Sequence, residues 1–129
     1  MSGGESPERR RFVRVEKGLP VRYKFISLDP RVTTGPETYE GYTHNISQGG
    51  LLLIGNLPDP EWGSRLLRHR IVMGVTVELT KAERGLRAVC RTAWLEPVEG
   101  GLTAFGLAFS EITQEDQDRL IRFILGHQL

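Results

Sequence analysis

The stretch HNISQGGLLLI, from His44 to Ile54, places short polar residues and two adjacent glycines directly before four large aliphatic residues. A simple hairpin needs only two turn residues between its strands. Asn and Ser side chains in a tight turn can bond either the backbone or a ligand, and glycines let a flat ligand approach the backbone closely. We therefore interpret Asn45, Ser47 and Gly50 as a turn that also holds a ligand. The alternative is a turn that satisfies only its own hydrogen bonds.

The segments on both sides of this turn predict short strands. From Leu19 onward, apolar Val21, Tyr23 and Phe25 alternate with Arg22 and Lys24, which is typical of a half-buried strand. Further strands are expected at residues 38–44, 51–54, 75–79, 86–96 and 103–112. About six strands at this short spacing predict an all-β barrel or sandwich.

The hydrophobic period changes near the C-terminus. Four apolar residues there are expected to share one helical face: Leu120, Ile121, Ile124 and Leu125. Thr113 is a predicted N-cap, with Asp116 three residues later, and Gly126 ends the pattern. We expect a helix of about residues 114–125 laid across the barrel.

The bulk composition indicates one small domain outside the membrane. The chain has 129 residues, which suits a single hydrophobic core. Cys90 is its one cysteine, which excludes an internal disulfide and a cysteine-rich zinc site. No apolar run approaches the roughly 20 residues of a membrane-spanning helix, and the N-terminus lacks the apolar core of a signal peptide. We expect a cytoplasmic protein.

A basic segment precedes the first strand. Between Glu8 and Lys24, seven basic residues stand against two acidic ones, a net charge of +5. Arg10 and Arg14 are spaced as Arg-x-x-x-Arg, with Arg9 immediately before. Arginine can bond a phosphate or a guanine with two parallel hydrogen bonds and can stack on a base. The segment therefore favours an anionic partner, although a solvated basic arm explains the charge alone.

Catalytic and metal-binding patterns are not found. His44, His69 and His127 lack metal-ligand spacing, and Cys90 lies within an alternating strand, where a small core residue is expected. Glycine-rich phosphate loops are absent, and the acids at residues 116 and 118 are interpreted as helix-start charges. We expect no enzyme activity, no metal and no cofactor.

Arg10-x-x-x-Arg14 ahead of a first strand, followed by Asn45-x-Ser47-x-x-Gly50, resembles the PilZ domain, a bacterial receptor for cyclic di-GMP. The resemblance covers about residues 8–126. It implies a mainly β fold: a six-stranded antiparallel barrel at 19–112, a C-terminal helix at 113–126 and a flexible ligand-binding arm at 9–18. Residues 1–8 are predicted to be disordered.

The resemblance also implies roles for individual residues. Arg10 and Arg14 would contact guanine and phosphate, while Asn45 and Ser47 would hydrogen-bond a guanine above the floor that Gly50 keeps low. An arginine directly before the Arg-x-x-x-Arg motif, here Arg9, implies that two intercalated ligand molecules bind rather than one. Residues 9–11 are three arginines in a row, so Arg11 is the alternative contact residue if they align with the family motif in another register.

The resulting hypothesis is a cyclic di-GMP receptor that changes conformation and signals through a protein partner, regulating motility, biofilm or exopolysaccharide. One alternative is a PilZ-fold adaptor that binds no nucleotide, and another is a small basic barrel that binds single-stranded nucleic acid. Residues 56–74 receive no role, although Asp59-Pro60 could open a short helix there, which Gly63 disfavours. Their basic patch (Arg65, Arg68, His69 and Arg70) could extend the site, contact a partner or be a solvated helix face. Trp62 and Trp94 are expected in the core or at the barrel rim.

Overall fold

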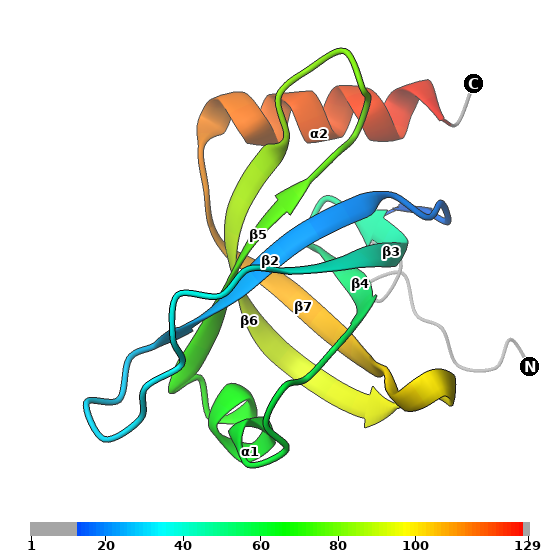
Figure 1. The fold of residues 1–129 in the computed structure, drawn as a ribbon. Coiled ribbons are helices and arrows are strands. Elements are labelled where there is room, and N and C mark those ends of the chain that lie inside the picture. The colour runs from blue at the N-terminus through cyan, green and yellow to red at the C-terminus, as the bar shows by residue number, and fades with distance from the viewer. Residues whose placement is uncertain (1–12, 128–129) are drawn as a thin grey trace, which may run out of the picture.

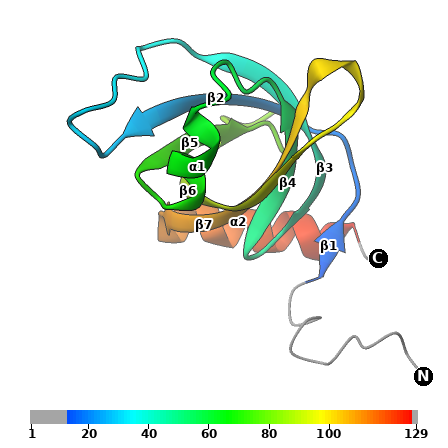
Figure 2. The ribbon, with the colours of Figure 1, turned by 90° about the horizontal axis from the view of Figure 1, so that it is seen from below.

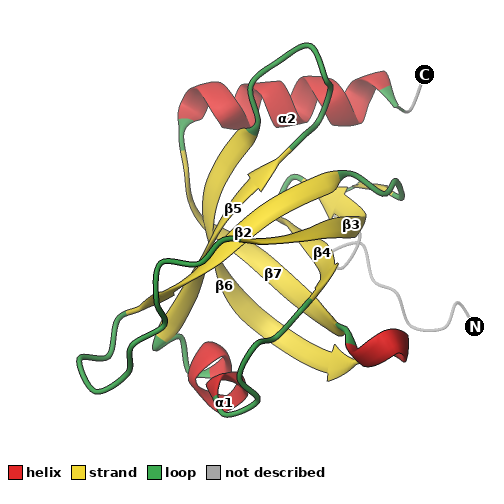
Figure 3. Cartoon of the chain, in the orientation of Figure 1, coloured by secondary structure: helices red, strands yellow, loops and turns green. Residues whose placement is uncertain are grey.

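The computed structural model describes residues 13–127. Figure 3 shows that this part of the chain contains more strand than helix. In chain order the elements are β1 (Arg14–Val15), β2 (Pro20–Ser27), β3 (Tyr39–Ser47), β4 (Gly50–Gly55), α1 (Trp62–Leu67), β5 (Ile71–Val77), β6 (Leu86–Pro97), a 3-10 turn (Glu99–Gly101), β7 (Thr103–Ile112) and α2 (Gln114–Gly126).

Six strands form a closed antiparallel barrel. Neighbouring strands pair in the order β3-β2-β5-β6-β7-β4, and a further pairing of β3 with β4 closes the ring. Figure 2 shows the ring, with the short β1 beside β3 on its outside. The predicted six-stranded barrel is therefore confirmed, with one additional strand.

The barrel interior is filled by the apolar residues of the predicted alternating patterns. Val21, Tyr23 and Phe25 of β2 are each 2% exposed or less, and Val75 and Val77 of β5 are also buried. The Tyr23 hydroxyl donates to the Asn56 carbonyl at 2.8 Å and accepts from the Asn56 N–H at 2.6 Å. The one polar atom that β2 sends into the core is thus satisfied, as burial requires.

The C-terminal helix begins as predicted. The Thr113 hydroxyl accepts a hydrogen bond from the Asp116 N–H at 3.1 Å, and α2 ends at Gly126. Its buried apolar residues are Leu120 and Ile124. The expectation that Leu125 faces the core was wrong: its side chain is 55% exposed. Figure 1 shows α2 and α1 at opposite ends of the barrel.

Three elements depart from the sequence expectations. β1 and α1 are short elements that were not firmly predicted, and β5 begins at Ile71, four residues before the predicted strand. Arg9, Arg10 and Arg11 lie outside the described residues, so the predicted arm is described only from Val13 onward. None of the helices within residues 13–127 is long and apolar enough to cross a lipid bilayer.

Candidate functional site

Strand pairing joins the two motifs that the sequence placed some thirty residues apart. In the ladder between β1 and β3, Arg14 lies opposite Ser47, and Val15 lies opposite Ile46. Val15 and Ile46 are 8% and 0% exposed, so apolar burial holds this short pairing in register. The arginine motif therefore ends beside the Asn-x-Ser-x-x-Gly motif.

A buried threonine fixes the chain that follows β1. The Thr43 hydroxyl accepts from the Leu19 N–H at 3.0 Å and donates to the Lys17 carbonyl. The Thr43 N–H also donates to the Leu19 carbonyl at 2.9 Å. With Thr43 fully buried, these three bonds tie the segment between β1 and β2 to β3 and so limit where Arg14 can lie.

The turn between β3 and β4 is held by its own hydrogen bonds. The Ser47 hydroxyl accepts from the Gly49 N–H at 3.3 Å and donates to the Gly50 carbonyl at 3.4 Å. The Phe109 N–H of β7 donates to the Gly49 carbonyl at 3.0 Å, which fastens the turn to the next strand. Ser47 thus organises the turn, and its oxygen keeps acceptor capacity for a ligand.

Gly50 is required by packing at the base of this turn. A Cβ at this position would lie 1.9 Å from the Leu107 carbonyl oxygen and 3.1 Å from the Ala108 Cα. Both contacts are with the backbone of β7, which cannot move without breaking the ladder between β4 and β7. The absence of a side chain therefore lets β4 pair closely with β7, and residues of both strands form the floor here.

A cavity of about 250 Å³ opens above this floor. Arg14, Asn45, Ser47 and Gly50 all line it, so four of the six predicted site residues share one cavity. The other two, Arg9 and Arg10, lie outside the described residues. Within the part of the chain that is described, neither the Asn45 amide nor the Arg14 guanidinium has a hydrogen-bond or ion-pair partner. We call this cavity the candidate site.

The cavity also contains a tryptophan that the sequence analysis did not assign to the site. Trp94 of β6 lines the cavity and is 44% exposed. A bulge between Thr92 and Trp94 interrupts the strand alternation, so Trp94 turns outward, and its partner in the ladder is Gly106. A Cβ on Gly106 would lie 2.2 Å from the indole Nε1, so the indole lies against this glycine. The bulge was not recognisable from the sequence, which is why Trp94 was missed.

The candidate site combines groups that suit a purine nucleotide. Arg14 supplies a cation, Asn45 supplies an amide that can donate and accept, and Trp94 supplies a flat aromatic surface. Base stacking on an aromatic side chain stabilises binding by roughly 1–3 kcal/mol. The lining thus offers a cation, an amide and an aromatic face, the groups that contact a phosphate and a flat base.

Catalytic groups are not placed here. Cys90 is fully buried, and burial raises the pKa of its thiol to about 12, so the thiol stays protonated. Among residues 13–127 no group of three His, Cys, Asp or Glu side chains is arranged to hold a metal.

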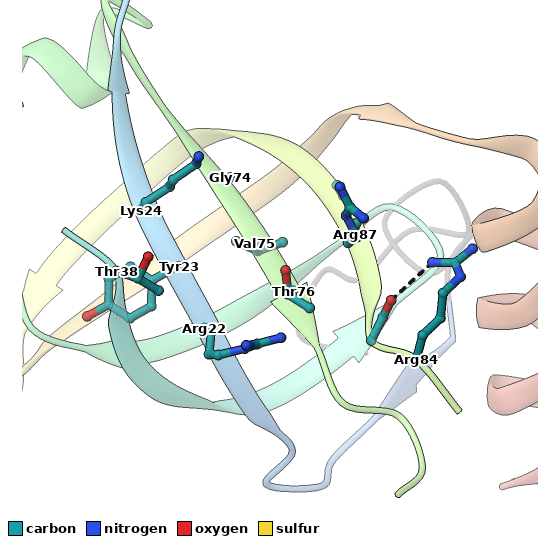
Figure 4. A pocket seen from close by; sticks show the side chains of 11 residues that line it. Arg22, Tyr23, Lys24, Thr38, Gly74, Val75, Thr76, Arg84 and Arg87 are labelled. Carbon is teal, nitrogen blue, oxygen red and sulfur yellow. Dashed lines mark hydrogen bonds between the residues drawn. The ribbon is translucent and has the colours of Figure 1, made fainter. Parts of the chain in front are cut away.

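Larger hollows lie elsewhere on the surface, so size alone does not select the site. One of about 460 Å³ lies over β2, β5 and β6 and includes Arg22, Lys24 and Arg87 (Figure 4). Arg22, Thr76 and Arg87 face one another across these three strands. No residue of the sequence motifs lines this hollow.

Comparison with known structures identifies the architecture. The chain is similar to the Bacillus subtilis inhibitor of motility MotI (TM-score 0.67, 20% identity), covering 93% of this chain and 51% of that one. It thus spans about half the length of MotI. It is also similar to the PilZ domain of YcgR from Escherichia coli with c-di-GMP (TM-score 0.60, 12% identity), and the match covers 93% of this chain and 92% of that one. A third similar structure is the K. pneumoniae MrkH–c-di-GMP complex (TM-score 0.57, 17% identity), where the match covers 93% of this chain and 52% of that one.

A comparison with proteins of curated function finds no significant match. The profile of the PilZ domain matches residues 8–126, nearly the whole length of the sequence. The barrel and C-terminal helix have the arrangement of the solved PilZ domains. The chain belongs to the PilZ domain family.

Proposed function

We propose that this PilZ domain binds cyclic di-GMP at the candidate site and acts as a receptor rather than an enzyme. The observation that carries the proposal is the single cavity that contains Arg14, Asn45, Ser47 and Gly50. Two solved structures with similar folds are described with the same ligand, YcgR and MrkH. Trp94 adds a stacking surface on the far wall.

The described cavity accommodates part of the ligand. Its volume of about 250 Å³ lies below the roughly 300–1,000 Å³ of pockets that enclose a whole small ligand. We assign one guanine to the space between Asn45 and Trp94. Arg14 and the preceding Arg9 and Arg10 then contact the phosphates and the second guanine. If Arg9 bridges a second ligand molecule, two intercalated molecules bind.

Binding at this place would convert ligand occupancy into a signal. Arg14 lies on β1, which is only two residues long and pairs with one edge of β3. A ligand that bonds both Arg14 and Asn45 ties the N-terminal segment to the barrel. The new surface formed there is available to a cytoplasmic protein partner, as expected for a regulator of motility or exopolysaccharide.

The proposal is tested by isothermal titration of the protein with cyclic di-GMP. Arg14→Ala removes a charge-assisted hydrogen bond of roughly 1.5–3 kcal/mol, so affinity should fall about 10- to 100-fold. Arg22→Ala removes the same charge from the separate hollow of Figure 4 and should leave affinity unchanged. A stoichiometry of two that Arg9→Ala reduces to one would assign the second molecule to Arg9. Equal losses in the Arg14 and Arg22 variants, or no binding by the unaltered protein, would refute the proposal.

A further inference from the structure

A recess of about 420 Å³ lies at the α1 end of the barrel, between the loop after β2 and the segment that joins α1 to β5. Its lining consists of Arg31, Arg65, Arg68, Arg70, Asp29 and Ser64, and we call it the arginine recess. None of these residues lines the candidate site. Four guanidinium groups from two distant segments face one carboxylate, a net charge of +3.

Asp29 fixes two of the arginines. Its carboxylate is 4% exposed and accepts from Nε and Nη2 of Arg31, both at 3.1 Å. Nη2 of Arg70 lies 3.6 Å from the same group. The Leu28 N–H donates to the Arg70 carbonyl at 2.8 Å, so the two segments are also joined by their backbones. Arg31 and Arg70 are therefore held in position although their side chains are 79% and 52% exposed.

The remaining two arginines are not neutralised. Arg65 donates to the carbonyl of Glu61, the residue before α1, at 3.3 Å, and has no carboxylate partner within residues 13–127. Arg68, at the end of α1, has no carboxylate within ion-pair distance among residues 13–127. Four like charges around one recess repel each other, and Asp29 offsets only part of this repulsion. An anion with two or more charges would offset the rest.

The donor type suits an anion that presents several oxygens. All four cations are arginines, whose planar fork matches two oxygens of a phosphate, and Ser64 adds a hydroxyl. Its four arginines come from the loop after β2 and from the α1 region and line one recess, whereas Arg22 and Arg87 lie in a row across β2, β5 and β6 in the hollow of Figure 4. This arrangement fits a compact ligand with several oxygens on one centre.

We propose that the arginine recess is a second binding site, for a phosphoryl or diphosphoryl group, independent of the candidate site. The group belongs either to a free phosphorylated molecule or to a phospholipid headgroup, because both present the same oxygens. The site gives a role to residues 56–74, whose basic patch the motif of the candidate site does not explain.

The test uses inorganic pyrophosphate as the probe in an isothermal titration of the whole chain. Arg65→Ala with Arg68→Ala removes two arginines that do not contact Asp29, so the fold is retained, as thermal melting would verify. We expect at least tenfold weaker pyrophosphate binding. The matched control, Arg22→Ala with Arg87→Ala, removes the same charge elsewhere and should change binding less than twofold. Arg14→Ala should also leave pyrophosphate binding intact, which separates this proposal from cyclic di-GMP binding.

A second arm distinguishes the source of the phosphate. Sedimentation with phosphatidylglycerol vesicles, against phosphatidylcholine vesicles, tests the lipid headgroup with the same variants. Binding of pyrophosphate, or of anionic vesicles, that is lost only in the Arg65/Arg68 variant supports the proposal and assigns the source. Binding of neither probe, or equal loss in the Arg22/Arg87 control, overturns it.

Discussion

Position 50 requires a glycine because no side chain fits between β4 and β7 beside the candidate site. Any Cβ at this position meets the backbone of Leu107 and Ala108, and both lie in the middle of a paired strand. The sequence indicated a close approach at this glycine, but attributed it to a ligand. The structure places the backbone of a neighbouring strand there, so the glycine is required even without a ligand.

Gly50→Ala should therefore destabilise the fold. Overpacking of this kind typically costs about 1–3 kcal/mol, and we expect a value at the upper end because both partners are backbone atoms. Urea denaturation gives the free energy of unfolding. Gly126→Ala is the control, since a Cβ there meets nothing within 4 Å. A loss for Gly50→Ala no larger than that of the control would contradict the packing argument.

Trp94 offers a direct optical report on the candidate site. The chain has two tryptophans, and Trp62 packs against the core at the α1 end of the barrel. In a Trp62→Phe variant, cyclic di-GMP should change the emission of the remaining Trp94. In a Trp94→Ala variant, emission should stay constant and affinity should fall about tenfold, as expected for a lost stacking contact. The reverse pattern would place the ligand away from Trp94.

At the scale of elements, α2 is anchored by a buried carboxylate rather than by apolar contacts alone. Asp116 is 2% exposed and lies 2.8 Å from Nη1 of Arg119 and 3.0 Å from Nη2 of Arg84. Its carboxylate also accepts from the Arg87 N–H at 3.1 Å, which joins α2 to β6. Burial alone would raise the pKa of Asp116, but the Arg87 N–H and the two guanidiniums hold it below its usual value.

Asp116→Asn should loosen this anchor. Removing the Asp116 charge leaves the buried Arg119 with only the exposed Glu83 as an ionic partner among the described residues. Breaking a buried charge cluster in this way typically costs about 3–5 kcal/mol. The free energy of unfolding from urea denaturation measures the loss. Asp118→Asn, on the exposed side of the same helix, should cost less than about 0.5 kcal/mol. Similar values for the two variants would show that the cluster does not anchor α2.

The elements differ in how well their sequences predicted them. Long alternating strands and the capped helix were predicted well, because burial on one face imposes a regular period. β1 has two residues and no period, so only its tertiary pairing with β3 reveals it. In α1, Gly63 argued against a helix, yet Gly63 is buried there and its helix packs on β6. Packing thus overrode local propensity.

At the scale of the whole molecule, the motifs predicted which residues meet, but not what surrounds them. The resemblance to PilZ domains grouped Arg14, Asn45, Ser47 and Gly50, and the structure brings them to one cavity. The position of Trp94 depends on the register between β6 and β7. The arginine recess forms because two segments that are distant in the sequence meet at the α1 end of the barrel. Neither feature can be predicted from the spacing of residues along the chain.

Acid should destabilise the whole domain at a defined pH. Hydrogen bonds from the Arg31 side chain and N–H, together with nearby arginine charges, lower the pKa of Asp29 to about 2, and the pKa of Asp116 is also lowered. Both values lie below the roughly 3.9 of an unfolded aspartate. The stabilisation from these groups is therefore complete above about pH 4 and is lost as the pH falls towards 2.

Urea denaturation at a series of pH values checks this expectation. The free energy of unfolding should change little between pH 7 and 5 and fall steeply below about pH 4. An Asp29→Asn, Asp116→Asn double variant should show a shallower fall, because it has lost both groups. A free energy that rises between pH 4 and 3 would contradict the assignment.

The location of the ligand is tested most directly by amide chemical-shift mapping of the ¹⁵N-labelled protein with cyclic di-GMP. We predict that the perturbed amides are those of residues 45–50, 93–94 and 106–108, together with the Trp94 indole N–H, while the amides of Arg31 and Arg68 stay unchanged. Shifts centred on the arginine recess or on the β2–β5–β6 face, or no shifts at saturating ligand, would contradict cyclic di-GMP binding at the candidate site.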